Sequence, residues 1–398
     1  MAPTKGAALE ELVRAYFARQ GYFAVRSVPY RFEEEEVTDL DVWLYSRPTA
    51  SARIKAIVDV KNKRSPKAFE RVLWVKGIQD ALQCDRAFVA TTDASASLVR
   101  FASGQKITVL SKSFLERLEK KLEVEDRLTL EAFSARVTAN PSYKQDGDWL
   151  RVLGDAKSAV ASLPGFQAFN KTMFAFKFFA ERAEVRMQNR DIAVRCALLT
   201  AGLACIALDA ALARFVFEDA DRRLQGLIEG VHYGDAGDGR ARKNLENAVS
   251  VLSEGMENGR AIAAKARANL DTRLGALRAD VIGEHFMREH NAQHLFGAGK
   301  ELDEAAHSIE PRILPLEVRA ILGVFADFVG VKRTTLPIGN VVPVATTTAA
   351  PPGEQVTTPA PEPPKETAGD KAAGAPEENP ASTPSTEPGP PDTQGTLI

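Results

Sequence analysis

The sequence predicts an α/β domain over residues 1–122, an all-helical domain over residues 123–335 and a disordered tail over residues 336–398. Strand-like and helix-like segments alternate in the first region, which is typical of a mixed sheet flanked by helices. Strand signals almost vanish in the second region, where Ala, Leu, Arg and Glu dominate at helical period. Residues 341–398 contain 13 of the 22 prolines and no aromatic residue, a composition that buries too little apolar surface to fold.

Composition and charge exclude several classes of protein. Three cysteines among 398 residues, none in a CxxC pair, are too few for a disulfide framework and indicate a reduced, cytoplasmic setting. The first residues contain no apolar leader segment. The apolar run at residues 196–208 has 13 residues, whereas a membrane span needs about 20. We therefore expect a buried helix there and no membrane partner.

The first predicted elements follow from spacing and turn residues. Apolar residues recur at helical spacing up to Gly21, which predicts a helix over residues 7–20. A short strand over residues 22–28 is expected to end before Pro29. The four glutamates at residues 33–36 are typical of a solvated loop.

Two strands with alternating polar and apolar side chains come next, at residues 37–45 and 53–61. Ser65 and Pro66 supply the N-cap and the first position of a helix. A strand, a helix, a strand and a helix are then expected at residues 86–91, 95–103, 106–110 and from Ser113.

The helical region carries no catalytic motif. Six phenylalanines gather between residues 166 and 179, and we expect them to contribute the core of a helix bundle. A helical domain attached to an α/β domain can select a substrate, hold a protein partner or form a homodimer. The sequence does not choose among these roles.

Polar side chains on the two alternating strands carry the chemistry. Asp39 and Asp41 are two residues apart and therefore point to one face of their strand. Asp59 and Lys61 share a face of the next strand in the same way. If the strands are neighbours, Asp41, Asp59 and Lys61 converge, and Glu10 can approach from the preceding helix. The alternative is that these side chains are only the solvent faces of two edge strands.

A converging set of this kind suits metal-assisted hydrolysis of a phosphodiester. Mg²⁺ prefers oxygen ligands and keeps several waters, so two carboxylates leave room for a substrate phosphate. The metal neutralises the phosphodiester and helps to make a hydroxide nucleophile. A lysine beside it can orient the water and stabilise the developing charge. Two converging carboxylates can therefore hold Mg²⁺, and a lysine beside them can assist the hydrolysis of a phosphodiester.

Four short segments carry a family resemblance over about residues 5–120. They are Gly6-Ala-Ala-Leu-Glu10-Glu-Leu-Val13, Thr38-Asp39-Leu40-Asp41-Val42, Val58-Asp59-Val60-Lys61 and Val75-Lys-Gly-Ile-Gln79. In this order of helices and strands, they resemble the PD-(D/E)XK nuclease superfamily, most closely its Mrr-like, restriction-endonuclease-like branch.

The resemblance implies a restriction-endonuclease-like fold for the first domain and a metal-dependent endonuclease that cuts DNA, in defence or in repair. It implies metal binding by Asp41 and Asp59, help from the Val60 carbonyl, a catalytic role for Lys61 and an auxiliary acid at Glu10.

Some of these assignments have competitors. Asp39 competes with Asp41 for the metal, and we prefer Asp41 because it directly precedes an apolar run. Glu11 competes with Glu10 for the role of the auxiliary acid. Gln79, on the helix after the (D/E)-x-K strand, is a further auxiliary candidate.

A basic stretch follows the proposed active strand. Residues 53–76 hold eight lysines and arginines against two acidic residues, a charge pattern that suits a phosphate backbone. We expect the DNA contacts to come from Lys63, Arg64, Lys67, Arg71 and Lys76. The alternative function is a catalytically silent nucleic-acid-binding or scaffolding protein with the same fold.

Overall fold

The computed structural model describes residues 5–33, 35–61, 67–92, 95–121, 127–185, 190–235, 240–254, 258–310 and 312–337. The predicted tail lies outside this part of the chain from residue 338 onward, and Leu336, assigned to the tail from the sequence, is buried. Residues 1–342 form one compact unit, so the α/β and helical regions pack against each other. The boundaries predicted near residues 122 and 335 stay predictions.

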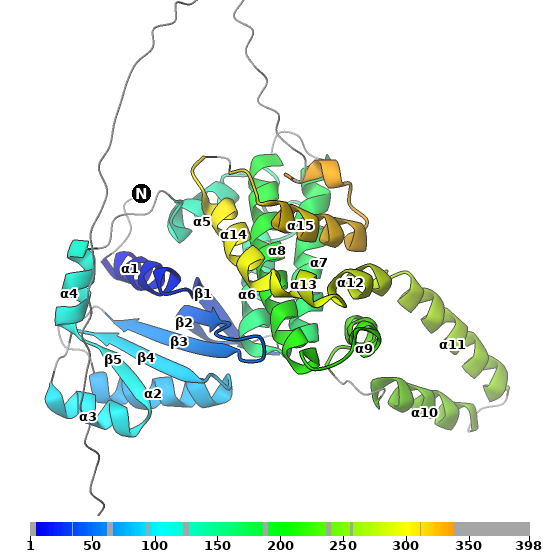
Figure 1. The fold of residues 1–398 in the computed structure, drawn as a ribbon, viewed down its shortest axis with the longest axis horizontal. Helices are drawn as coiled ribbons and strands as arrows, with labels where there is room; N and C mark the ends of the chain where they lie inside the picture. The colour runs from blue at the N-terminus through cyan, green and yellow to red at the C-terminus, as the bar shows by residue number, and fades with distance from the viewer. Residues whose placement is uncertain are drawn as a thin grey trace, which may run out of the picture. The chain divides into compact units, whose positions relative to one another are not determined.

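A five-stranded mixed sheet forms the first part of the fold, as predicted (Figure 1). Its elements are α1 (Lys5–Arg19), β1 (Phe23–Phe32), β2 (Glu35–Ser46), β3 (Ile54–Lys61), α2 (Ala68–Ala81), β4 (Arg86–Thr91), α3 (Ala96–Gly104), β5 (Ile107–Leu110) and α4 (Lys112–Lys121). The strands lie side by side in chain order, with β1 and β5 at the edges. β1, β2 and β3 are antiparallel neighbours, whereas β3, β4 and β5 run parallel through helical crossovers.

Helices cover both faces of this sheet. α1 and α4 pack on one face in an apolar cluster that includes Val13, Val42 and Leu115. α2 and α3 pack on the opposite face (Figure 1). The helical region adds α6 (Trp149–Ser162), which packs against β1. The result is a layered arrangement in which the strands are buried from two sides.

The ladder between β2 and β3 ends at the pair Val42–Val58. Beyond that pair, β2 stays hydrogen-bonded to β1, while β3 continues beside β4 as far as Lys61. The two strands therefore separate. We call the opening between Asp39–Asp41 and Asp59–Lys61 the strand fork.

Three element boundaries differ from the sequence prediction. β1 continues through Pro29 to Phe32, because an edge strand tolerates a residue that cannot donate to a ladder. β2 begins at Glu35, so part of the glutamate run is strand rather than loop. α2 begins at Ala68, with Lys67 at its N-cap position, two residues after the predicted start, and Ser65 and Pro66 themselves lie outside the described residues.

The second part of the fold is helical, as predicted. Besides α6, it contains α5 (Leu130–Thr138), α7 (Gly165–Val185), α8 (Arg190–Leu212), α9 (Ala220–Tyr233), α10 (Arg240–Glu254), α11 (Gly259–Gly275), α12 (Ala279–Phe286), α13 (Glu289–Gln293), α14 (Leu295–His307) and α15 (Leu316–Val329), with single 3₁₀ turns at Ala213–Phe215 and Arg333–Thr335. α14 crosses α8 closely, since a Cβ at Gly299 would lie 3.1 Å from the Gly202 carbonyl oxygen.

α8 is the core helix of this bundle. It is long and apolar enough to cross a membrane, yet 89% of its most apolar window is buried inside the protein, which agrees with the prediction of a buried helix. The phenylalanine cluster supplies much of the surrounding core, with Phe166, Phe169, Phe176 and Phe179 fully buried. Phe174 departs from the prediction, because 74% of it is exposed.

A buried carboxylate joins the sheet to the helical region. Asp209 of α8, 1% exposed, accepts a 2.6 Å hydrogen bond from the Tyr45 hydroxyl. It also pairs with Arg53 at 2.7 Å and Arg47 at 3.0 Å. Burial raises the pKa of Asp209, and the two guanidinium groups oppose that rise. Two cations and a hydroxyl therefore offset the cost of burying this charge.

Candidate active site at the strand fork

At the strand fork, the side chain of Asp41 accepts a hydrogen bond from β3 in place of the backbone of β2. Its Oδ2 accepts a 2.6 Å hydrogen bond from the backbone N–H of Val60. This bond satisfies a donor that the separating strand leaves without a backbone partner. No residue in the described ranges donates a hydrogen bond to the Oδ1 atom of Asp41, so this oxygen is available to bind a cation.

Lys61 lies between the two predicted metal ligands. Its Nζ atom is 3.5 Å from Asp41 Oδ2 and 3.9 Å from Asp59 Oδ1. The Asp59 side chain is 4% exposed and that of Lys61 is 30% exposed, so the set runs from the protein interior to solvent. Three of the residues singled out in the sequence therefore converge, as the alternation of the strands indicated.

Arg71 holds the inner carboxylate. This residue of α2 donates from Nε to Asp59 Oδ2 at 3.0 Å, and its terminal nitrogen contacts Asp59 Oδ1. Its guanidinium also lies over the ring of Trp74, 4.2 Å from the centroid. The sequence predicts Arg71 as a DNA contact, and in this structure it neutralises Asp59; the DNA contact stays a prediction. A planar guanidinium suits this two-point contact.

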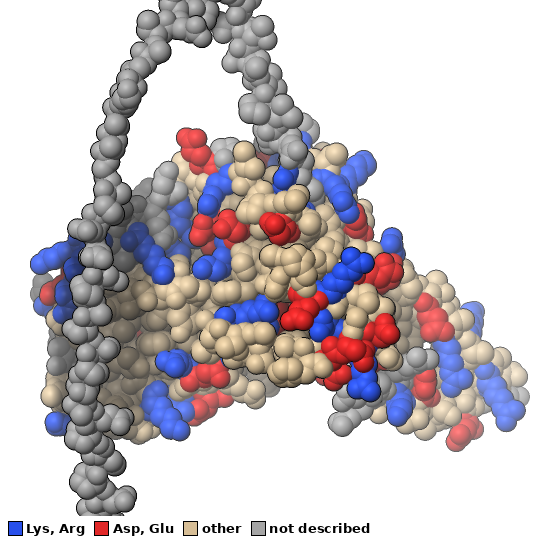
Figure 2. Space-filling model, viewed as in Figure 1, with Lys and Arg blue, Asp and Glu red and all other residues tan. Residues whose placement is uncertain are grey.

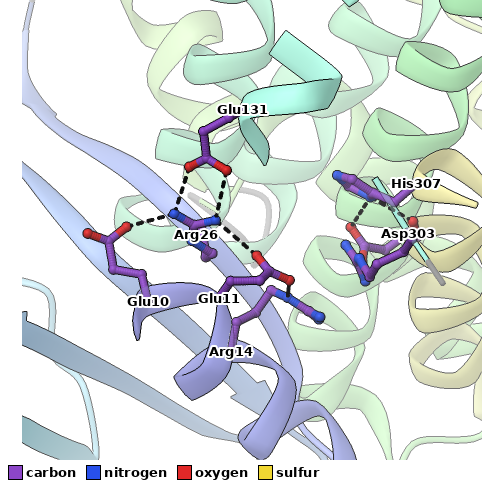
Figure 3. A network of polar contacts seen from close by, with 8 residues as sticks. Glu10, Glu11, Arg14, Arg26, Glu131, Asp303 and His307 are labelled. Carbon is purple, nitrogen blue, oxygen red and sulfur yellow. Dashed lines mark hydrogen bonds and ion pairs between the residues drawn. The ribbon is translucent and has the colours of Figure 1, made fainter. Parts of the chain in front are cut away.

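Glu10 is turned to an arginine rather than to the fork. It pairs at 2.9 Å with Arg26 of β1, which also contacts Glu11 and Glu131 at 2.9 Å (Figure 3). We call Arg26 and its three carboxylates the Arg26 node. Burial raises the pKa of Glu10, and the hydrogen bond and charge of Arg26 oppose that rise; Asp41 and Lys61 have smaller effects, a rise and a lowering. Glu10 is therefore close enough to the fork to be affected by its charges.

The auxiliary candidates lie in different places. Asp39 is next to Asp41 on its strand, and partial desolvation together with the Asp41 charge raises its pKa to about 6. Gln79 is buried, and its amide nitrogen donates to the Cys84 carbonyl at 3.1 Å. That bond supports the turn between α2 and β4. The contacts of Gln79 are thus those of a structural residue.

The predicted basic surface is partly neutralised along α2. Lys67 pairs with Glu70 at 3.2 Å, and Lys76 pairs with Asp80. Lys63 and Arg64 lie outside the described residues. Over the face drawn in Figure 2, positive and negative side chains of the helical part are interspersed. The described part of the predicted surface therefore has a weaker positive field than the sequence count suggests.

The residues at the fork fit a divalent cation on chemical grounds. Among the described residues, no three His, Cys, Asp or Glu side chains are grouped closely enough to hold a metal alone. Mg²⁺ commonly takes one or two protein carboxylates and fills its other positions with water and phosphate oxygens. Asp41 keeps one oxygen free, and Asp59 is held by a cation that a metal would replace. The fit thus requires Arg71 to leave Asp59.

The polar alternation of β2 and β3 does not predict the contacts of Arg26 with its carboxylates or the contact of Arg71 with Asp59. Arg26 did give a signal, because an arginine inside an otherwise apolar strand needs carboxylate partners when it is buried, and Glu10 and Glu11 are nearby in sequence. Arg71 gave none, since its position depends on how α2 rotates over the sheet.

A scan against protein-family models, a search of curated proteins and a search of solved structures each found no match to this chain. The functional argument therefore rests on the geometry of the strand fork.

Proposed function

We propose that this protein is a Mg²⁺- or Mn²⁺-dependent endonuclease that hydrolyses phosphodiester bonds in DNA, with a PD-(D/E)XK, restriction-endonuclease-like first domain. The observation that supports it is the position of Lys61 Nζ, 3.5 Å and 3.9 Å from the carboxylates of Asp41 and Asp59. Two carboxylates and a lysine at the end of separating strands form a rigid, partly exposed set. Surface side chains that only solvate a sheet have no reason to converge in this way.

Each residue then has a defined task. Asp41 and Asp59 would hold the cation, with the Val60 carbonyl as a further oxygen ligand. When bound, the cation neutralises the phosphodiester and lowers the pKa of a coordinated water. Lys61 orients that water and stabilises the charge that develops on the phosphate.

Arg71 and Glu10 act beside this centre. Arg71 would release Asp59 to a bound cation and would then be available to the substrate phosphate, whose oxygens suit a planar guanidinium. Glu10 is an auxiliary acid whose position is fixed by Arg26.

The second candidate function is a catalytically silent nucleic-acid-binding or scaffolding protein. The two contacts from Arg71 to Asp59 favour it, since they occupy both oxygens of a carboxylate that a nuclease needs. In this case the ion pair is permanent and Asp59 serves the fold.

The biological setting follows from the same proposal. DNA is the partner, the compartment is the cytoplasm, and the role is in defence or repair. One site cuts one strand at a time, so the helical region is proposed to form a homodimer or to hold a protein partner.

Metal binding can be measured without cleavage. Trp43 and Trp149 are 1% exposed, whereas Trp74 is partly exposed and lies against Arg71. Displacement of Arg71 by Mg²⁺ should therefore change the emission of Trp74, and the change should vanish in Trp74→Phe. An Mg²⁺ titration without any change in wild-type emission would favour the silent protein.

Cleavage is then tested on supercoiled plasmid with Mg²⁺, with Mn²⁺ or with EDTA. The wild type should nick or linearise the plasmid with either metal, and Asp59→Asn should not. Asp271→Asn, on the exposed side of α11, is the matched control and should cut like the wild type. Cleavage by Asp59→Asn at the wild-type rate would refute the assignment of the site.

A further inference from the structure

An apolar groove lies in the helical region, on elements that take no part in the strand fork. α10 and α11 lie side by side as a helical hairpin (Figure 1), and neither packs extensively on any other described element. A cavity of about 520 Å³ opens along this hairpin. Its walls include Leu245 and Val249 of α10, Ala266 and Leu270 of α11, and Tyr233 at the end of α9. We call this cavity the hairpin groove.

The apolar side of the hairpin is left uncovered. Among the residues of the two helices whose burial the structure describes, only Gly259 and Ala263 are buried. Leu245 is 36% exposed and Leu270 is half-buried, although both line the groove. Helices of this length are marginal in water unless their apolar faces pack against something. We therefore expect a partner to cover the hairpin groove.

The rim of the groove carries charges of both signs. Glu246 of α10 and Arg267 of α11 line it from opposite helices. Arg267 makes no ion pair with any residue in the described ranges. When a surface meets its own copy about a twofold axis, each contact forms twice. Glu246 of one copy then faces Arg267 of the partner copy, and the reverse contact forms at the same time.

The chemistry of the groove favours a protein partner over DNA. A phosphate backbone carries one sign of charge only and is bound by cationic surfaces. It would meet Glu246 as well as Arg267, and it would lie over an apolar floor. A second hairpin offers both apolar side chains for that floor and both charges for its rim.

The size of the hairpin is enough for a dimer contact. α10 and α11 have 15 and 17 residues. At about 1.5 Å per residue and a diameter of about 10 Å, the two helices together present a face of about 500 Å². Two such faces bury about 1,000 Å² in total, which is the area at which specific interfaces begin. We therefore expect a dimer that dissociates on dilution.

We propose that the hairpin groove binds the same hairpin of a second copy of this chain, so that two pairs of helices form a four-helix bundle. Leu245, Val249 and Leu270 of each copy supply the apolar contact, and Glu246 and Arg267 set its orientation. This self-association stands alone. Its consequence, that two strand forks act on the two strands of one DNA, rests on the proposed function.

Self-association is tested by light scattering during size-exclusion chromatography of the full chain over about 1–100 µM. The mass of the wild type should rise from that of one chain to that of two. Leu270→Glu should raise the dissociation constant at least about tenfold, because its carboxylate would be buried in the contact. A wild type that stays monomeric at every concentration would overturn the proposal.

The matched control for Leu270→Glu is Ala268→Glu on the same helix. Ala268 is exposed, and residues two apart on a helix do not face the same way. Ala268→Glu should therefore dimerise like the wild type. Both variants should keep the circular dichroism and the unfolding curve of the wild type. Equal weakening of the dimer by the two substitutions would show that the groove is not the contact.

A charge exchange tests the twofold arrangement. Glu246→Arg alone and Arg267→Glu alone should each weaken the dimer, because like charges then meet across the axis. An equimolar mixture of the two variants should form a heterodimer more tightly than either variant forms a homodimer. A mixture no tighter than its components would contradict the contact. Weaker DNA retention by Arg267→Glu, with an unchanged mass, would identify the groove as a DNA contact instead.

The consequence for cleavage has a separate readout. If the fork cuts DNA, the wild type should linearise supercoiled plasmid above the concentration at which it dimerises. Leu270→Glu should accumulate nicked circles under the same conditions. If the fork does not cut DNA, light scattering still decides whether the hairpins associate. The two proposals thus fail in different experiments.

Discussion

Two arginines in and beside the sheet, Arg26 and Arg71, neutralise carboxylates in contrasting ways. Arg26 is 3% exposed and touches three carboxylates from α1 and α5. Arg71 is 26% exposed and engages one carboxylate, Asp59, from a neighbouring helix. The first arrangement joins elements that must stay together. The second is open to solvent on one side, and we therefore expect another cation to compete with Arg71 for Asp59. Burial and the number of partners therefore separate a structural ion pair from an exchangeable one.

The strongest test of this contrast is Arg26→Met. The substitution removes the cation from three partly buried carboxylates, and breaking a buried pair of this kind costs about 3–5 kcal/mol. Urea unfolding at pH 7.5 should register a loss in that range. Arg136→Met, on the exposed side of α5, should change stability by less than about 0.5 kcal/mol. A loss of the same small size in Arg26→Met would mean that the Arg26 node is not structural.

Lys61→Met tests the chemistry of the fork. Loss of a group that stabilises the developing charge should lower plasmid nicking by about 10²–10³-fold. The Mg²⁺-dependent emission of Trp74 should remain, because both carboxylates are intact. Loss of that emission change together with cleavage would indicate that Lys61 supports the fold of the site rather than the reaction.

Arg71→Gln tests whether the Asp59 pair is exchangeable. In EDTA the variant should lose about 1–2 kcal/mol, because Asp59 keeps only the more distant Lys61 as a cationic partner. Mg²⁺ should then restore stability, and should raise the melting temperature of the variant more than that of wild type, where it must first displace Arg71. Equal shifts in both proteins would contradict competition between Arg71 and the metal.

Asp39 provides the smallest expected effect. Its folded pKa of about 6 lies above the ordinary value of 3.8, so the folded state binds the proton more tightly than the unfolded state does. Its contribution to stability is then present at low pH and is lost as pH rises through about 6. Asp39→Asn should stabilise the protein by about 0.5 kcal/mol at pH 7.5, a value kept small by solvent screening. Comparable gains at pH 4 and pH 7.5 would show that the effect is not the carboxyl titration.

The sequence predicted the parts of the site that depend on strand alternation. The period of two put Asp41 on the same side as Asp59 and Lys61, and hydrophobic patterning gave the five strands in their order. Contacts set by the docking of one element on another were out of reach. The pairing of Arg71 with Asp59 depends on how α2 is rotated over the sheet. The pairing of Glu10 with Arg26 depends on where α1 crosses β1.

The predicted basic surface shows a further limit of reasoning from the sequence. Counting charges along residues 53–76 gave a strong positive stretch, yet Lys67 and Lys76 each pair with an acid on their own helix. Spacings of three and four residues bring such partners together on a helix. These pairs were therefore predictable from the sequence once the helix was known. Glu70 is already one of the two acidic residues in the count, whereas Asp80, the partner of Lys76, lies outside residues 53–76.

The buried contact between Tyr45 and Asp209 also bears on how the chain is made. The two residues are separated by 164 positions. Arg127 likewise donates a hydrogen bond to Asp303, which is 176 positions away in the sequence. During synthesis, the strands of the sheet are made well before α8, which carries Asp209. A nascent chain that has not reached residue 209 exposes the apolar side of β2 and leaves Arg47 and Arg53 without their anion. Contacts of such long range slow folding and leave sticky intermediates. Production of this protein should therefore depend on chaperones that shield the sheet until the helices emerge.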